Sequence, residues 1–136
     1  MKRFFRILLL SALALTFRPA LAGAQNGVYD VFVPISKYLS QGDADKLSAW
    51  FADNLEVSIG QSSYNASKTQ ARQIVKSFFD TNAPRSFVVS HTAGKNNSKY
   101  AIGTMKAGGD TYLITVFVNI EGQGYKIQSL KIEPMP

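Results

Sequence analysis

Residues 125–133 read Tyr-Lys-Ile-Gln-Ser-Leu-Lys-Ile-Glu. The apolar residues of this segment stand at odd positions, 125 and 127, in its first half and at even positions, 130 and 132, in its second half. Successive side chains of an ideal strand point to opposite faces, so Leu130 and Ile132 lie opposite the two apolar residues that precede them. One extra residue near Gln128 and Ser129, a β-bulge, returns all four to a single face. Because bulges bend strands, the segment predicts a strand in a curved sheet.

Three more strands are predicted upstream of this one. Residues 86–92, 100–106 and 111–120 read as strands, with a hydrophobic period near two. Short clusters rich in glycine, asparagine and aspartate separate these segments. Connections of this length join neighbouring antiparallel strands. We therefore expect the second half of the chain to be an antiparallel meander of four strands.

Between residues 28 and 80, the spacing of the apolar residues changes to a period near 3.6 residues. Apolar residues recur at helical spacing over residues 28–39, and Gly42 stands where a left-handed C-terminal cap is needed. Asp43 is expected to cap a second helix of about eight residues, which carries Trp50 and Phe51 toward the core. The sequence therefore predicts two consecutive helices joined by a tight turn.

A turn at residues 53–54 leads into a predicted strand over residues 55–60. The third helix has the clearest local signature, because Ser67 and Gln70 form a capping-box pattern ahead of an apolar stripe. This helix is expected to end near residues 80–82. Together these patterns predict one α+β domain in which three N-terminal helices pack on a strongly curved sheet.

The amino-terminal segment predicts a cleavable signal peptide. Basic residues precede an apolar run over residues 7–17, and the small-x-small sites that follow place cleavage after Ala24 or, alternatively, after Ala22. The run is too short to cross a membrane, which takes roughly 20 apolar residues. We therefore expect residues 1–24 to be removed and residues 25–136 to be periplasmic or secreted, as a single domain without a membrane anchor.

Most of the net positive charge of the chain belongs to this leader. The leader holds four of the fifteen basic residues and none of the nine acidic residues, which leaves residues 25–136 with a net charge of +2. The remaining basic residues are scattered, whereas binding of single-stranded nucleic acid needs a basic groove with interleaved aromatic residues. We therefore do not expect nucleic-acid binding.

Cysteine is absent from the chain and histidine occurs once, at position 91. The absence of cysteine excludes thiolate metal sites, thiol catalysis and a lipid-bearing cysteine. A single histidine without clustered carboxylates does not complete a metal site, and no P-loop or dinucleotide motif is present. We therefore expect neither a metal nor a cofactor.

Two segments carry a resemblance to a known family. Residues 41–47 read Gln-Gly-Asp-Ala-Asp-Lys-Leu and residues 51–57 read Phe-Ala-Asp-Asn-Leu-Glu-Val. With the capped third helix and the terminal strand, they resemble the nuclear transport factor 2-like superfamily. More narrowly, they resemble the exported Bacteroidota proteins classed as domain of unknown function 4783. The resemblance covers residues 27–134 and implies a cystatin-like cone with a mixed, mostly antiparallel sheet. It does not select a function, because such cones include enzymes, ligand binders and dimerisation modules.

The enzyme alternative rests on two residues. Isomerases and cyclases with similar cones use a carboxylate or a histidine of an apolar pocket to move protons. In this chain, the predicted strands between residues 86 and 120 contain neither aspartate nor glutamate. An isomerase- or cyclase-like enzyme that uses His91 or Asp53 is the alternative interpretation, and no catalytic residue is assigned.

The preferred interpretation is a non-enzymatic binding domain. The strand over residues 111–120 is apolar on both faces, so helices are expected to cover one face and a second subunit or a partner the other. Similar cones commonly form homodimers in this way. The open end of the cone also suggests a pocket for a small apolar ligand. The residues predicted to line that pocket are Trp50, Tyr64, Tyr112, Phe117, Asn119 and His91.

Overall fold

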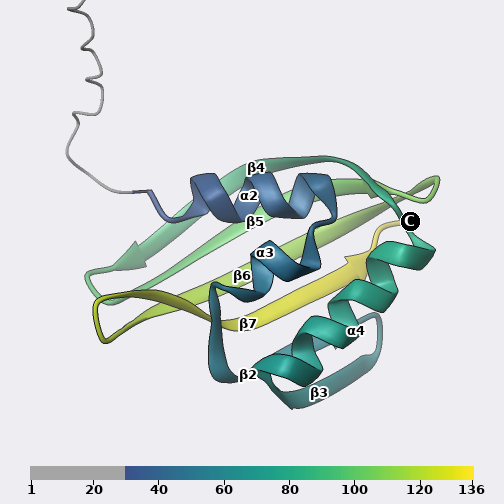
Figure 1. Ribbon diagram of the computed structural model, residues 1–136. Helices are drawn as coiled ribbons and strands as arrows, with labels where there is room; N and C mark the ends of the chain where they lie inside the picture. Colours follow the sequence, from purple (N-terminus) through teal and green to yellow (C-terminus); the bar gives the residue numbers. More distant parts are fainter. Residues whose placement is uncertain (1–29) are drawn as a thin grey trace, which may run out of the picture. The chain divides into compact units, whose positions relative to one another are not determined.

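A curved six-stranded sheet organises the computed structural model, which describes residues 30–136 (Figure 1). The strands lie in the order β3-β2-β7-β6-β5-β4. Strands β2 and β7 are parallel, and the other neighbouring pairs are antiparallel. The strands are β2 (Phe51–Ile59), β3 (Ser62–Ser67), β4 (Pro84–Lys95), β5 (Ser98–Ala107), β6 (Asp110–Glu121) and β7 (Gly124–Pro134).

The predicted leader falls outside this description. Residues 1–24, with the cleavage sites after Ala22 and Ala24, lie outside the described residues. Val28, where the first predicted helix starts, also lies outside the described residues. Residues 31–136 form one compact unit.

Three helices lie against one face of the sheet: α2 (Phe32–Gln41), α3 (Ala44–Ser48) and α4 (Lys68–Thr81) (Figure 1). Gly42 ends α2 with a φ of 66°, and its N–H donates to the Leu39 carbonyl at 3.2 Å, so the predicted left-handed cap is confirmed. The Asp43 carboxylate accepts a hydrogen bond from the Lys46 N–H at 3.0 Å and thereby caps α3.

The predicted capping box at the start of α4 is also confirmed. The Ser67 hydroxyl accepts a hydrogen bond from the Gln70 N–H at 3.2 Å, and the Gln70 side-chain carbonyl accepts one from the Ser67 N–H at 3.1 Å. The helix ends at Thr81, within the predicted range of residues 80–82. Its apolar stripe, formed by Ala71, Val75, Phe78 and Phe79, is buried against the sheet.

The arrangement of three N-terminal helices is wrong. The hairpin of β2 and β3 separates α3 from α4, so the third helix lies in the middle of the chain. Sequence patterning missed β3 because its residues, Ser-Ser-Tyr-Asn-Ala-Ser, show no alternation of apolar side chains. They form a strand because each pairs with a residue of β2 in an uninterrupted antiparallel register.

Helix α3 is also shorter than predicted. It has five residues, because Phe51 already belongs to β2. The Trp50 carbonyl accepts a hydrogen bond from the Ile127 N–H at 2.6 Å, and this bond to β7 ends the helical segment. The turn expected at residues 53–54 therefore does not form, and both residues lie inside β2.

The bulge predicted in the last strand is confirmed. Phe117 of β6 lies opposite Ser129, and the next residue, Val118, lies opposite Ile127, so Gln128 is the extra residue of β7. The predicted face is therefore restored, because the apolar residues on both sides of the bulge point toward the helices. The core that they join includes the fully buried side chains of Ile35, Leu39, Leu47, Phe51, Val57, Met105, Ile114, Ile127, Leu130 and Ile132.

Candidate functional site

The two faces of β6 lie in different environments. Even-numbered residues from Tyr112 to Val118 are buried beneath the helices, whereas the odd-numbered residues from Leu113 to Phe117 keep part of their surface exposed. No helix of residues 30–136 covers that second side, because α2, α3 and α4 all lie on the first (Figure 1). We refer to the second side as the helix-free face. On β4, β5 and β6 its central part is formed by Val88, His91, Tyr100, Ile102, Thr104, Leu113, Thr115 and Phe117, and Lys95 and Lys106 lie on the same side toward the strand ends.

This part of the helix-free face is apolar for a surface in contact with water. Val88 keeps 64% of its surface exposed and Phe117 keeps 39%. A sheet that is solvated on one side usually places polar residues there. Here the side chains are aliphatic, aromatic or β-branched, apart from the imidazole of His91. A contiguous apolar surface of this kind marks an interaction site more often than a solvated one.

Three rings form a row across this face. The ring centroids of Phe117 on β6 and Tyr100 on β5 are 5.4 Å apart, and those of Tyr100 and His91 on β4 are 5.9 Å apart. These separations are typical of favourable aromatic contacts. The aromatic row therefore presents a rigid, largely apolar strip that runs across three neighbouring strands.

His91 reaches the aromatic row through a second bulge. Val89 pairs with Gly103 and His91 with Ile102, so Ser90 is an extra residue in β4. Uninterrupted alternation from Val89 would place His91 on the same, inner side. The bulge reverses this orientation, and His91 lies exposed on the helix-free face.

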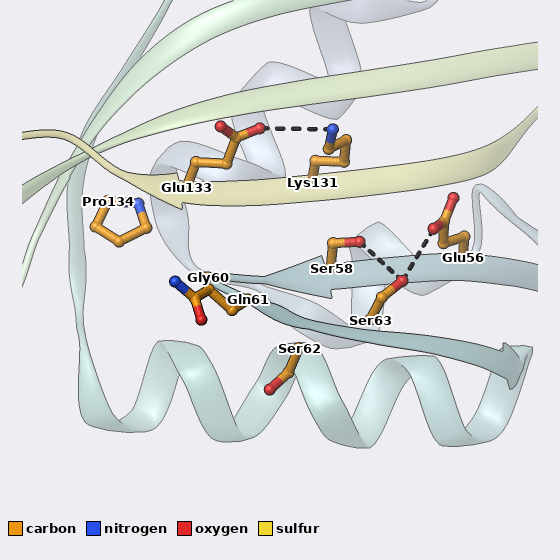
Figure 2. A pocket seen from close by; sticks show the side chains of 9 residues that line it. All are labelled: Glu56, Ser58, Gly60, Gln61, Ser62, Ser63, Lys131, Glu133 and Pro134. Carbon is orange, nitrogen blue, oxygen red and sulfur yellow. Dashed lines mark hydrogen bonds and ion pairs between the residues drawn. The ribbon is translucent and has the colours of Figure 1, made fainter.

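The other half of the helix-free face is polar. A hollow of about 600 Å³ lies there, lined by residues of β2, β3 and β7. Figure 2 shows the side chains that line it. Ser63 donates a hydrogen bond to a Glu56 carboxylate oxygen at 2.9 Å and accepts one from Ser58 at 3.2 Å. Lys131 and Glu133 form an ion pair at 3.7 Å. Because these groups already satisfy one another, the hollow resembles the polar rim of an interface more than the centre of one.

The six residues predicted to line a ligand pocket lie in several places. Phe117 and His91 belong to the aromatic row. Tyr112 lies in the core, where its ring meets Phe78 edge-on at 5.1 Å and its hydroxyl donates to the Asn82 side-chain oxygen at 3.2 Å. Asn119 is exposed near the end of β6 and accepts a hydrogen bond from the Ser98 hydroxyl at 2.8 Å.

The remaining two predicted residues lie elsewhere. Trp50 is partly buried against the core between α3 and β2, and Tyr64 of β3 is 45% exposed beside α4. The structure therefore brings together only Phe117 and His91 of the six, and ligand binding by the set stays a prediction. Sequence reasoning missed Tyr100 and Val88, although combining the alternation of β4, β5 and β6 with their order in the sheet would have placed both on one face.

The two residues named for the enzyme alternative are also apart. Asp53 is exposed on β2 and His91 is exposed on β4, and three strands lie between these two in the sheet. Within the described residues, no group of three or more histidine, cysteine, aspartate or glutamate side chains is placed to hold a metal ion. In the same range, no helix has both the length and the apolar character needed to cross a membrane.

The ionisation of Tyr112 is expected to make the stability of the protein depend on pH in the alkaline range. Burial, and secondarily the negative charge of Asp110, raise the pKa of Tyr112 above its ordinary value. The unfolded chain therefore loses this proton first, at about pH 10, and stability falls as the pH rises from there through the raised pKa. We expect wild-type protein to lose stability above about pH 10 more steeply than Tyr112→Phe, as measured by urea unfolding. Equal slopes would contradict this prediction.

Comparisons with known proteins place this geometry in a family. The family model described as a domain of unknown function, DUF4783, matches residues 32–133. No curated protein matches the chain. A DUF4783 family protein from Bacteroides uniformis ATCC 8492 has a TM-score of 0.76 and 20% identity, over 79% of this chain and 99% of that one.

Two more distant structures share the fold. A protein of unknown function with a cystatin-like fold from Nostoc punctiforme PCC 73102 has a TM-score of 0.60 and 16% identity, over 77% of this chain and 86% of that one. A structure described as Rd1NTF2_04 with long sheet has a TM-score of 0.60 and 17% identity, over 74% of this chain and 94% of that one. The predicted resemblance is therefore confirmed at the level of family and fold.

Proposed function

We propose a function for this chain, which belongs to the DUF4783 family of unknown function, from the face that its helices leave uncovered. It is an exported, non-enzymatic binding domain that pairs with a second copy of itself through the helix-free face. The observation that carries this proposal is the aromatic row of His91, Tyr100 and Phe117, set among exposed aliphatic side chains. Aromatic residues dominate the energetics of interfaces, because each buries a large area with few rotatable bonds.

A second copy of this chain suits the helix-free face better than a highly charged partner protein would. The central part of the apolar half contains no charged residue and is bordered by Lys95 and Lys106, and the polar half holds acidic Glu56 and Glu133 close to basic Lys131. A two-fold interface places one surface against an identical surface, so it requires a patch that does not repel itself. An apolar centre beside a rim of mixed charge meets this requirement.

Pairing is also favoured over binding of a small apolar ligand inside the cone. The side chains that point from β6 and β7 toward the helices, such as Ile114, Leu130 and Ile132, are fully buried. They fill the volume that an interior ligand would occupy, and interiors are close-packed. An internal ligand would have to displace them, whereas a partner on the helix-free face displaces only water.

Two valines test the proposal with a matched control. Val88 on the helix-free face is 64% exposed and Val33 on α2 is 65% exposed, so lysine at either position is tolerated by an isolated chain. In the paired protein, Val88→Lys buries a charge at the interface, and we expect it to weaken pairing at least tenfold, or about 1.4 kcal/mol. Val33→Lys is expected to pair like the wild type. Sedimentation equilibrium gives the three dissociation constants.

Two results would count against the proposal. One is a wild-type protein that remains monomeric at high concentration. The other is equal weakening by Val33→Lys and Val88→Lys, which would mean that general charge, and not the helix-free face, governs association. Circular dichroism of both variants verifies that they are folded before the comparison is made.

Export is the second part of the proposal and rests on residues 1–24. Their basic start, apolar run and small residues at positions 22 and 24 are the pattern that a signal peptidase uses. We expect the protein recovered from its own cell envelope to have the intact mass of residues 25–136. A mass that includes the leader, in protein recovered from the cytosol, would contradict export.

A further inference from the structure

The second surface of interest lies at the other edge of the molecule. A hollow of about 450 Å³ opens between β3 and α4. Its apolar lining comes from Tyr64, Ala66 and Ile74, of which Ala66 is buried and Ile74 packs partly against the core. We refer to it as the β3–α4 hollow. It lies beside an edge strand, because β3 is the last strand of the sheet and pairs only with β2 within residues 30–136.

The two edge strands of the sheet are protected to different degrees. Edges expose unpaired backbone groups, and proteins usually protect them with prolines, charged residues or bulges. Strand β4 carries all three, with Pro84, Arg85 and Lys95 and two shifts of register. Strand β3 carries none of them, and its pairing with β2 runs without a shift over six residues. Its outer backbone groups are therefore open to another extended segment.

The chemistry of the β3–α4 hollow suits a neutral segment. All of its lining residues are uncharged. On the helix side, the Thr69 hydroxyl and the Gln73 amide are exposed and have no hydrogen-bond partner among residues 30–136. An apolar floor beside available amide and hydroxyl groups favours an uncharged peptide that inserts one apolar side chain. A charged side chain would lose its hydration there without gaining an opposite charge.

We propose that β3 and the β3–α4 hollow form a docking site for an extended, uncharged peptide segment of a partner protein. The segment adds to the sheet as a strand along β3, with backbone hydrogen bonds on its outer edge, and places an apolar side chain between Tyr64 and Ile74. The β3–α4 hollow opens on the helix side of the sheet, and β3 reaches the helix-free face only at Ser62 and Ser63, which border its polar half. Docking is therefore tested separately from pairing through the apolar half.

The experiment uses short synthetic peptides in which threonine alternates with valine, leucine or phenylalanine. They are added to ¹⁵N-labelled protein, and amide shifts and hydrogen exchange are followed by NMR. We expect shifts confined to residues 62–74 and slower exchange of amides in β3. A matched peptide N-methylated at alternate residues lacks the edge donors, and we expect it to bind at least tenfold more weakly.

A pair of helix variants localises the side-chain contact. Gln73→Glu places a charge in the hollow and is expected to weaken binding about tenfold. Ser77→Glu, one turn further along the exposed side of α4, is expected to have no effect. Three outcomes would overturn the proposal: no protection of β3 by any peptide, equal binding of the N-methylated peptide, or equal effects of the two glutamates. Self-association that Gln73→Glu abolishes would overturn it too, by showing that β3 pairs with a second copy.

Discussion

Gly103→Ala is expected to destabilise the protein by about 3 kcal/mol, because the added methyl group has no room. A Cβ at position 103 would lie 2.5 Å from the Phe87 ring and 2.6 Å from the Val88 carbonyl oxygen. The ring can rotate away, but the carbonyl belongs to the backbone of β4 and moves only if β4 and β5 separate. Gly103 therefore lets the two strands that carry Val88, His91 and Tyr100 pack closely.

Gly124→Ala is the matched control for this substitution. A Cβ at position 124 meets no atom within 4 Å, and the residue is exposed at the start of β7. We expect a change of about 0.5 kcal/mol or less, as for most surface substitutions. Urea unfolding of both variants gives the two free energies. Gly103→Ala with the stability of Gly124→Ala would show that β4 and β5 are not as close as described.

Leu130→Ala is expected to cost about 3 kcal/mol, because it leaves a cavity in the core. Leu130 is fully buried and lies between Val57 of β2 and Val116 of β6 in the sheet. It faces the helices because Gln128 is bulged. The size of the effect therefore tests both the core and the bulge that orients the second half of β7.

The same substitution on the opposite face is the control for Leu130. Leu113 of β6 points to the helix-free face and is only partly buried. In the Val88→Lys background, at a concentration low enough to keep the copies apart, we expect Leu113→Ala to cost about 1 kcal/mol. Unfolding of both alanine variants in that background makes the comparison. A larger loss for Leu113→Ala than for Leu130→Ala would mean that the two faces are assigned the wrong way round.

Local chemistry made part of the fold predictable. A left-handed glycine, an aspartate cap and a serine–glutamine capping box each satisfy helix-end groups within a few residues, so Gly42, Asp43 and Ser67 could be interpreted without knowledge of the rest. The bulge at Gln128 was predictable because four apolar side chains must share one face. Each of these features has its cause in the segment where it occurs.

The wrong predictions for β3, α3 and β4 share one cause, which is pairing with residues outside the segment itself. Strand β3 is polar and owes its conformation to pairing with β2, and α3 ends early because Trp50 accepts a hydrogen bond from Ile127, far along the chain. The bulge at Ser90 leaves no comparable sign, because the residues around it include apolar side chains on both faces. Tertiary pairing therefore decided the structure where propensity was weak.

The candidate site shows the same limit. The predicted set combined Tyr112 and Phe117, which strict alternation already places on opposite faces of β6. The aromatic row required the order of β4, β5 and β6 in the sheet and the reversal of His91 by a bulge. Residue types were thus a poor guide to the site until the register was known.

Pairing through the helix-free face is tested most directly by an isotope-filtered NOE measurement on a mixture of ¹³C-labelled and unlabelled copies. Only contacts between copies give signals in this experiment. We expect signals that join the Phe117 and Tyr100 rings of one copy to Val88, Leu113 or Ile102 of the other. Signals between copies that involve only α2, α3 or α4, or none at all at high concentration, would contradict the proposed function.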